Sequence, residues 1–229
     1  MGAITPEVLY EDNQILVAVK PYNMPSQLDE TGDVDMLSVM KGYIKVKYDK
    51  PGDVYLGLVH RLDRPTGGLM AFARTSKAAA RLTEEIQSGD FEKTYLAITC
   101  GIPREKQGRL THYLKKDEKT NVVEVVPQFE KDAKEATLLY KVLETYGDKY
   151  ALVEVKLLTG RSHQIRVQMA TIGCPLFGDV KYKGRSAKTL ALWAAKLEFL
   201  HPTTKDRLIF KAFPPESEPW KSFKIEKYM

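Results

Sequence analysis

One acidic side chain stands among basic ones in the segment His60-Arg61-Leu62-Asp63, which continues as Arg64-Pro65-Thr66-Gly67-Gly68. Apolar runs at 55–59 and 69–73 flank this segment, a pattern typical of two strands joined by a tight polar turn. Arg61, Arg64 and Arg74 lie close to Asp63 in the sequence. Nearby cations favour the ionised form of a carboxyl group, so Asp63 could act as a nucleophile beside an anionic substrate. The same residues would also suit a solvated surface turn.

A second basic motif, Leu157-Leu158-Thr159-Gly160-Arg161-Ser162-His163-Gln164-Ile165-Arg166, lies farther along the chain. Its spacing predicts a helix over 162–172 with Ser162 as the N-cap residue. Free amide groups and the helix dipole make a helix N-terminus a suitable place for an anion. Arg161 would precede that helix and Arg166 would project from its second turn, although both could equally be ordinary surface arginines.

The charge of the chain is distributed unevenly. The 229 residues carry a formal net charge of +5, but residues 156–229 hold 14 Lys or Arg against 6 Asp or Glu. Cationic surfaces of this kind gain affinity for polyanions by releasing condensed counterions. A nucleic acid is therefore a reasonable partner.

Several functional classes are disfavoured by the sequence. No apolar run approaches the roughly 20 residues of a membrane span, and residues 1–7 lack the pattern of a signal peptide. Cys100 and Cys174 are too few and too isolated for a disulfide framework, which favours a reducing cytoplasm. The histidines and cysteines show no metal-ligand spacing.

Hydrophobic periodicity and turn residues predict an α+β fold. Helices are expected at 36–48, 76–87 and 162–172, the second with Thr75 or Ser76 as N-cap and Gly89 as C-cap. Strands are expected at 15–19, 91–100, 109–114, 122–126, 136–143, 150–157, 189–199 and 207–213. Short joins between successive strands favour a long mixed, mostly antiparallel sheet with flanking helices.

Taken together, the motifs resemble those of the RluA-type family of RNA pseudouridine synthases. The matching blocks follow one another in the order Val17-Ala18-Val19-Lys20-Pro21, His60-Arg61-Leu62-Asp63, Glu92-Lys93-Thr94-Tyr95-Leu96-Ala97, Thr159 through Asp179, and Leu192 through Pro202. They span roughly residues 10–215 of the chain. Several ordered motifs are far more specific than one tetrapeptide.

The resemblance implies a fold and a reaction. It implies the pseudouridine synthase fold with a central catalytic cleft, formed by a single catalytic domain over 1–229 without a separate N-terminal RNA-binding domain. It also implies isomerisation of uridine to pseudouridine in RNA, in which the C1′–N1 bond breaks and C5 joins C1′. Such a reaction requires neither a metal nor an organic cofactor.

The resemblance also implies catalytic roles. Asp63 would be the nucleophile, with attack at C1′, attack at C6 and a glycal route all left open. Tyr95 would stack on the uracil. Arg166 would pair with Asp63, because a guanidinium can hold a carboxylate at two points, and Arg161 is the alternative partner.

Five further residues are expected to contact RNA. Arg61 would fill the stack vacated by the flipped base, since extracting a base costs a few kcal/mol of stacking energy. Arg161, Lys20 and Lys93 would contact phosphate. His60 is included in this set, although it could instead fix the turn structurally.

The expected partner is ribosomal or transfer RNA, bound by a monomer in the cytoplasm with no membrane association. Two alternatives are a non-catalytic RNA-binding module and a hydrolase that uses Asp63. A glycosidic hydrolase usually pairs two carboxylates. Glu84 and Glu85 are expected to be solvated on a helix, which disfavours that alternative.

Overall fold

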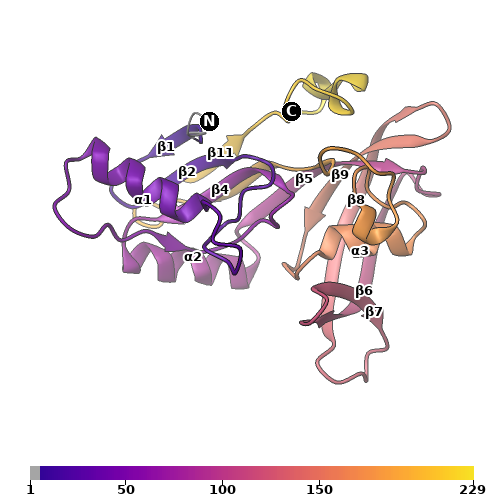
Figure 1. The fold of residues 1–229 in the computed structure, drawn as a ribbon, viewed down its shortest axis with the longest axis horizontal. Helices are drawn as coiled ribbons and strands as arrows, with labels where there is room; N and C mark the ends of the chain where they lie inside the picture. The colour runs from indigo at the N-terminus through magenta and orange to yellow at the C-terminus, as the bar shows by residue number, and fades with distance from the viewer. Residues whose placement is uncertain (1–5) are drawn as a thin grey trace. The chain divides into compact units, whose positions relative to one another are not determined.

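A computed structural model describes residues 6–229, and Figure 1 shows the path of the chain. Residues 1–5, which begin the segment tested for a signal peptide, lie outside the described residues. The chain divides into two compact units. Unit 1 contains the residues up to Phe91 together with Lys196–Ala212, and unit 2 contains Glu92–Ala195 together with Phe213–Met229. The expectation of a single catalytic domain stays a prediction.

Unit 1 is built on the strands β1 (Val8–Glu11), β2 (Ile15–Lys20) and β4 (Gly67–Ala73), which neighbour one another in that order. The short β3 (Gly57–Leu58) pairs with β4, and β11 (Arg207–Lys211) pairs with the end of β10 (Leu192–Leu200). All of these pairs are antiparallel. Every residue of β4 is buried, in keeping with its uninterrupted apolar sequence.

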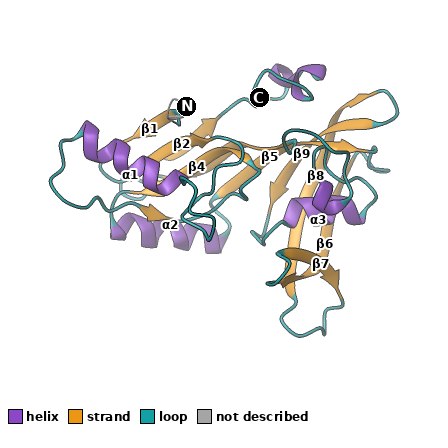
Figure 2. Cartoon of the chain, in the orientation of Figure 1, coloured by secondary structure: helices purple, strands orange, loops and turns teal. Residues whose placement is uncertain are grey.

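Both helices of unit 1 begin at a side chain that caps them, and the sequence predicts the cap of α2. In α1 (Met36–Lys47) the Asp35 side chain accepts a hydrogen bond from the amide of Ser38 at 3.0 Å. In α2 (Ser76–Ser88) the hydroxyl of Thr75 accepts from the amide of Ala78 at 3.0 Å. Gly89 ends α2 with a φ of 88°, a left-handed conformation that a glycine adopts without strain. Figure 2 shows the loop that precedes α1, as the sequence predicts.

Unit 2 contains a five-strand ladder with the order β5-β9-β8-β6-β7. The strands are β5 (Glu92–Cys100), β6 (Gln107–Asp117), β7 (Val122–Val126), β8 (Lys134–Tyr146) and β9 (Tyr150–Leu157). Each neighbouring pair is antiparallel. Strand β10 begins in this unit and ends in unit 1. The expected α+β class with a mostly antiparallel sheet is therefore confirmed.

Helix α3 (Gln164–Thr171) packs on the ladder of unit 2. Val167 joins a buried cluster with Leu114 of β6, Val123 of β7 and Ala136 of β8. The helix is shorter than expected, and the prediction that Ser162 caps it is wrong. His163 occupies the N-cap position in a left-handed conformation, and the side-chain oxygen of Gln164 accepts from the amide of Arg161 at 2.9 Å. Short 3₁₀ helices after α3 are η1 (Val180–Tyr182), η2 (Trp220–Ser222) and η3 (Ile225–Lys227).

Candidate functional site

The Asp63 turn of unit 1 is held by its backbone. The carbonyl of Asp63 accepts from the amide of Thr66 at 2.9 Å, which closes the turn between β3 and β4. The hydroxyl of Ser26 donates to the carbonyl of Leu62 at 2.7 Å, and the amide of Leu62 donates back to it at 3.1 Å. Asp63 is half-buried, so the predicted strand–turn–strand places a carboxylate at a fixed point near the protein surface.

The buried Lys20 contradicts its predicted role as a phosphate contact. Its side chain is fully buried at the end of β2, and its Nζ donates to the carbonyls of Pro21, Met24 and Arg64 at 3.1, 2.6 and 3.1 Å. Burial lowers the pKa of Lys20 to about 7, and Coulombic attraction to Asp63 opposes that shift. Lys20 therefore supports the Asp63 turn from inside.

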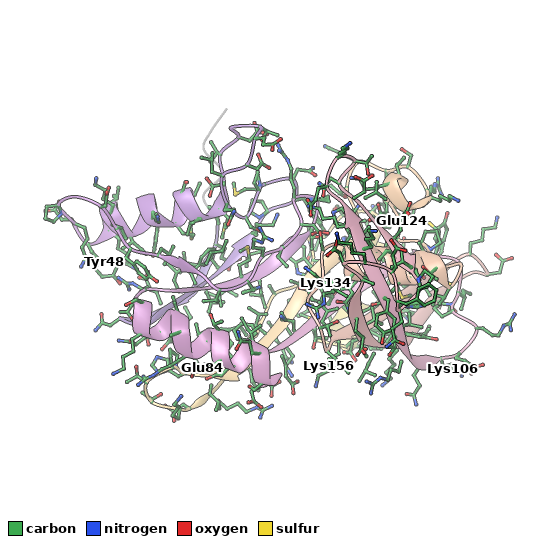
Figure 3. The ribbon with its side chains drawn as sticks, turned by 90° about the horizontal axis from the view of Figure 1, so that it is seen from below. Tyr48, Glu84, Lys106, Glu124, Lys134 and Lys156 are labelled. Carbon is green, nitrogen blue, oxygen red and sulfur yellow. The ribbon has the colours of Figure 1, made fainter. Side chains whose placement is uncertain are left out.

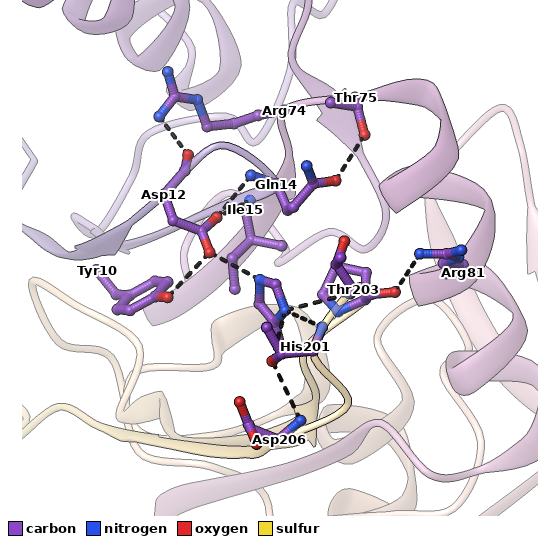
Figure 4. Close-up of polar contacts among 12 residues, drawn as sticks. Tyr10, Asp12, Gln14, Ile15, Arg74, Thr75, Arg81, His201, Thr203 and Asp206 are labelled. Atoms are coloured by element: carbon purple, nitrogen blue, oxygen red, sulfur yellow. Dashed lines mark hydrogen bonds and ion pairs between the residues drawn. The ribbon is translucent and has the colours of Figure 1, made fainter.

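Two arginines that the sequence places near Asp63 bind elsewhere. Arg64 forms an ion pair with Asp33 and donates to the hydroxyl of Thr31 at 3.0 Å. Arg74 donates to the carbonyl of Asp12, in the network that also contains His201 (Figure 4). Arg61 is exposed, as an RNA contact requires. Within unit 1, Lys20, which the sequence assigns to RNA, interacts electrostatically with Asp63.

His60 has a structural role in unit 1. Its Nε2 accepts a hydrogen bond from the amide of Ala71 at 3.0 Å, and its ring lies 5.4 Å from that of Phe91. Phe91 in turn stacks on Phe199 at 4.7 Å. These contacts fix the start of the Asp63 turn against β4, which supports the structural alternative for His60 over the RNA contact.

The carboxylates considered for a hydrolase differ from one another. Glu84, labelled in Figure 3, is exposed on α2 as expected. The prediction that Glu85 is solvated is wrong, because it is buried and its Oε2 accepts from the amide of Leu200 at 3.0 Å. Burial raises the pKa of Glu85. This carboxyl group therefore fastens α2 to the end of β10.

Strand β5 carries the candidate residues Lys93 and Tyr95 of unit 2. They are two residues apart, so their side chains share one face of the strand, opposite Leu157 and Val155 of β9. Tyr95 is buried, and burial lowers the pKa of Lys93. A Cβ atom at Gly160 would lie 3.7 Å from the Nζ of Lys93. The structure thus brings Lys93 beside the second basic motif.

Arg166 is buried on α3 and is held by a carboxylate that the sequence reasoning left without a role. Its Nε donates to Oδ2 of Asp179 and its Nη2 donates to Oδ1, both at 2.7 Å. The guanidinium carbon lies 5.1 Å from the centre of the Tyr182 ring. The Gly178-Asp179 pair within the late motif was the available signal for this contact.

Tyr182 connects three elements of unit 2. Its hydroxyl accepts from the amide of Val123 on β7 at 3.0 Å and lies 2.7 Å from Nδ1 of His163 at the start of α3. The tautomer of His163 decides which of the two groups donates in this hydrogen bond. The ring that supports Arg166 is therefore fixed at its far end.

Arg161 lies outside α3 and is exposed, as the sequence predicts. Its Nε donates to the carbonyl of Glu135 at 2.9 Å. This single backbone contact leaves the cation at the surface of unit 2. The position suits a phosphate contact.

Among residues 6–229 the structure shows no cluster of three His, Cys, Asp or Glu side chains placed to hold a metal ion. Within the same range, none of the helices is both long enough and apolar enough to cross a bilayer. Cys100 and Cys174 are free thiols.

The comparisons with known proteins agree on one family. The family model described as RNA pseudouridylate synthase matches residues 14–171, which is more than half of the chain. The chain belongs to this family. Members of this family isomerise uridine in RNA to pseudouridine, so the resemblance drawn from the motifs is confirmed.

Individual relatives support the assignment. An RNA pseudouridine synthase of Bacillus subtilis, YhcT, is 32% identical over 215 residues, covering 92% of this chain and 69% of the relative. The tRNA pseudouridine synthase C of Vibrio parahaemolyticus is 32% identical, covering 93% and 92%. The ribosomal large subunit pseudouridine synthase C of Rickettsia bellii is 34% identical, but the chain spans only 57% of it.

A solved structure carries the same fold. Human RNA Pseudouridylate Synthase Domain Containing 4 superimposes with a TM-score of 0.76 at 25% identity, covering 91% of this chain and 88% of that one. The expected pseudouridine synthase fold is confirmed.

Proposed function

We propose that this protein converts specific uridines of ribosomal or transfer RNA to pseudouridine with Asp63 as the nucleophile. Family membership supports the reaction, and the relatives named for ribosomal and transfer RNA support the substrate class. The observation that carries the residue assignment is the Asp63 turn itself. Its backbone is held by Ser26 and Thr66, and the buried Lys20 interacts electrostatically with the carboxylate.

The proposed reaction is an isomerisation, so the composition of the nucleoside does not change. The C1′–N1 bond breaks, the uracil turns, C5 bonds to C1′, the proton on C5 leaves to solvent, and N1 takes up a proton from solvent. Asp63 would act at C1′, at C6 or by starting a glycal route. An ionised carboxylate is needed in each case, and positive charge stabilises that form.

Tyr95 and Arg166 complete the proposed catalytic set. The buried ring of Tyr95 offers an apolar surface on which a uracil extracted from the RNA could stack. The guanidinium group of Arg166 is proposed to stabilise the ionised form of Asp63 or the substrate. Burial with a carboxylate partner keeps Arg166 in a defined orientation.

The proposed RNA contacts are Arg61, Arg161 and Lys93. Arg61 and Arg161 are exposed, as contacts to the vacated base stack and to phosphate require. Lys93 lies beside Gly160 of the second basic motif. We further propose that the protein works as a monomer in the cytoplasm without a metal or an organic cofactor.

The experiment that tests this function uses RNA labelled with tritium at C5 of uridine. The purified protein should release tritium to water from unmodified ribosomal or transfer RNA, because C5 exchanges its proton for C1′. Mapping pseudouridines in RNA from a deletion strain should then reveal the missing positions. RNA binding without tritium release from either RNA class would instead favour the non-catalytic binding module.

A further inference from the structure

The segment 175–191 is fastened to β5, the strand that carries Tyr95. The amide of Cys100 donates to the carbonyl of Pro175 at 2.7 Å, and the amide of Phe177 donates to the carbonyl of Ile98 at 2.8 Å. The amide of Ile98 donates to the carbonyl of Ala191 at 3.0 Å. Both ends of the segment are therefore hydrogen-bonded to β5 within five residues of Tyr95.

The segment is also closed on itself around Asp179. The amide of Gly178 donates to the carbonyl of Arg185 at 2.8 Å, and the amide of Gly184 donates to the carbonyl of Asp179 at 2.8 Å. A Cβ atom at Gly178 would lie 2.1 Å from the carbonyl oxygen of Thr189, and one at Gly184 would lie 2.0 Å from that of Leu176. Backbone approaches this close leave no room for a side chain, so the position of Asp179 is set by its main chain.

Asp179 then holds Arg166 at two points. Both side chains are almost inaccessible to solvent, at 7% for Arg166 and 1% for Asp179. A side-on pair through Nε and Nη2 fixes the plane of the guanidinium and directs Nη1 away from Asp179. The Tyr182 ring and its hydrogen-bonded hydroxyl limit rotation of the same group.

We propose that Asp179 is a positioning residue that sets Arg166 relative to Tyr95. Both ends of the chain of contacts lie in unit 2: β5 holds the segment, the segment holds Asp179, and Asp179 holds the guanidinium. The proposal rests on the proposed function, in which Arg166 and Tyr95 act in the same reaction. An error of about 1 Å in the placement of a catalytic group can lower a rate about 100-fold.

The test is a comparison of kcat and RNA affinity in Asp179→Asn, Asp179→Glu and wild type. Asparagine keeps the shape of the side chain, but it is uncharged and has only one oxygen that can accept a guanidinium hydrogen bond. We expect kcat to fall about 100-fold in Asp179→Asn while the Kd for RNA changes less than about threefold. Asp179→Glu keeps the charge and should recover part of the loss. A wild-type kcat in both variants would overturn the proposal.

A double-mutant cycle separates positioning from a general structural role. In an Arg166→Gln background, Asp179→Asn should lower kcat by less than about threefold, because the group that it positions is already missing. An undiminished 100-fold loss in that background would overturn the proposal. Glu198→Gln is the matched control, because Glu198 also pairs with an arginine, Arg207, but lies in unit 1 on β10. It should leave kcat unchanged.

An NMR signal of Arg166 tests the positioning by Asp179 without measuring activity, so it can fail independently of the proposed function. It also gives a second test if one variant does not fold. The Nε–H signal of Arg166, assigned by its absence in Arg166→Gln, should exchange slowly with solvent in wild type and rapidly in Asp179→Asn. If Asp179→Asn does not fold, a shifted signal with reduced kcat in Asp179→Glu supports the proposal. An unshifted signal overturns it. A wild type that releases no tritium from RNA would contradict the proposed function, whatever the signal shows.

Discussion

Among the described residues, unit 1 buries Lys20 and unit 2 buries Arg166, by opposite means. Lys20 of unit 1 is surrounded by three backbone carbonyls, whereas Arg166 of unit 2 is held by the carboxylate of Asp179. Carbonyl dipoles satisfy the hydrogen-bonding capacity of an ammonium group but supply no full negative charge. Burial therefore lowers the pKa of Lys20 to about 7, while a guanidinium paired with a carboxylate stays charged.

The difference indicates distinct tasks for the two cations. The ammonium group of Lys20 binds the carbonyls of Pro21, Met24 and Arg64, and so joins the loop after β2 to the Asp63 turn. Arg166 instead keeps a defined guanidinium plane on α3. One cation supports the fold around the candidate nucleophile, and the other presents hydrogen-bond donors. The following variants test that distinction.

The largest effect is expected for Arg166→Met. The change leaves the buried carboxylate of Asp179 without its partner, and breaking a buried ion pair in this way costs about 3–5 kcal/mol of unfolding free energy. Urea denaturation measures the loss. Arg207→Met removes an exposed arginine from Glu198, which keeps Lys196 as a second partner, and should cost under about 1 kcal/mol. Equal losses of unfolding free energy in the two variants would show that the buried Asp179 carboxylate does not need Arg166 as its partner.

Lys20→Met should have the next largest effect. It removes the donor shared by three carbonyls, and unsatisfied buried acceptors make a loss of about 2–3 kcal/mol the expected result. The matched control is Lys47→Met, whose ammonium group pairs with Glu11 at the surface and should contribute under about 1 kcal/mol. A Lys20 variant as stable as this control would contradict the assigned role.

The pH dependence of stability should separate the two cations. Lys20 has a pKa of about 7 in the folded state and 10.5 as its ordinary value, so between these values the unfolded chain binds more protons. Stability then rises with pH. From pH 7 to 9 the stability of wild type relative to Lys20→Met should increase by about 1 kcal/mol per pH unit. The difference in unfolding free energy between wild type and Arg166→Met should stay constant over the same pH range. A pH-dependent difference for Arg166→Met would contradict the distinction between the two cations.

The smallest expected effects concern the starts of the helices in the two units. Thr75→Ala removes the N-cap hydrogen bond of α2 and should cost about 1 kcal/mol. Ser162→Ala should cost less than about 0.5 kcal/mol, because Ser162 does not cap α3. Thermal denaturation of both variants gives the comparison. A larger loss for Ser162→Ala would restore the capping role predicted from sequence.

The fold was predictable where the hydrophobic pattern is strong. Continuous apolar runs identify β2 and β4, apolar residues at helical spacing identify α1, and capping residues locate α2. The sequence predicts this strand of the hairpin over 109–114, whereas β6 continues to Asp117. The added residues are polar and pair with β7 across the hairpin, as Lys115 does with Glu124. Edge pairing of this kind leaves no apolar signal.

The sequence names candidate residues for the site but not their contacts. Asp63, Tyr95 and Arg166 lie in a turn, a strand and a helix as expected, and their catalytic roles stay predictions. Lys20 donates to the carbonyl of Arg64, which is 44 residues away in the sequence. Arg74 donates to the carbonyl of Asp12, which is 62 residues away. Contacts at such separations are set by packing, which spacing along the sequence does not encode.

The central claim is that Asp63 carries the isomerisation, and a matched pair of isosteric changes tests it most directly. Asp63→Asn removes the proposed nucleophile, while Asp33→Asn removes a nearby exposed carboxylate that pairs with Arg64. Tritium release from C5-labelled RNA should fall to background in Asp63→Asn, with RNA affinity largely intact, and should stay at the wild-type rate in Asp33→Asn. Tritium release by a folded Asp63→Asn protein at the wild-type rate would contradict the account.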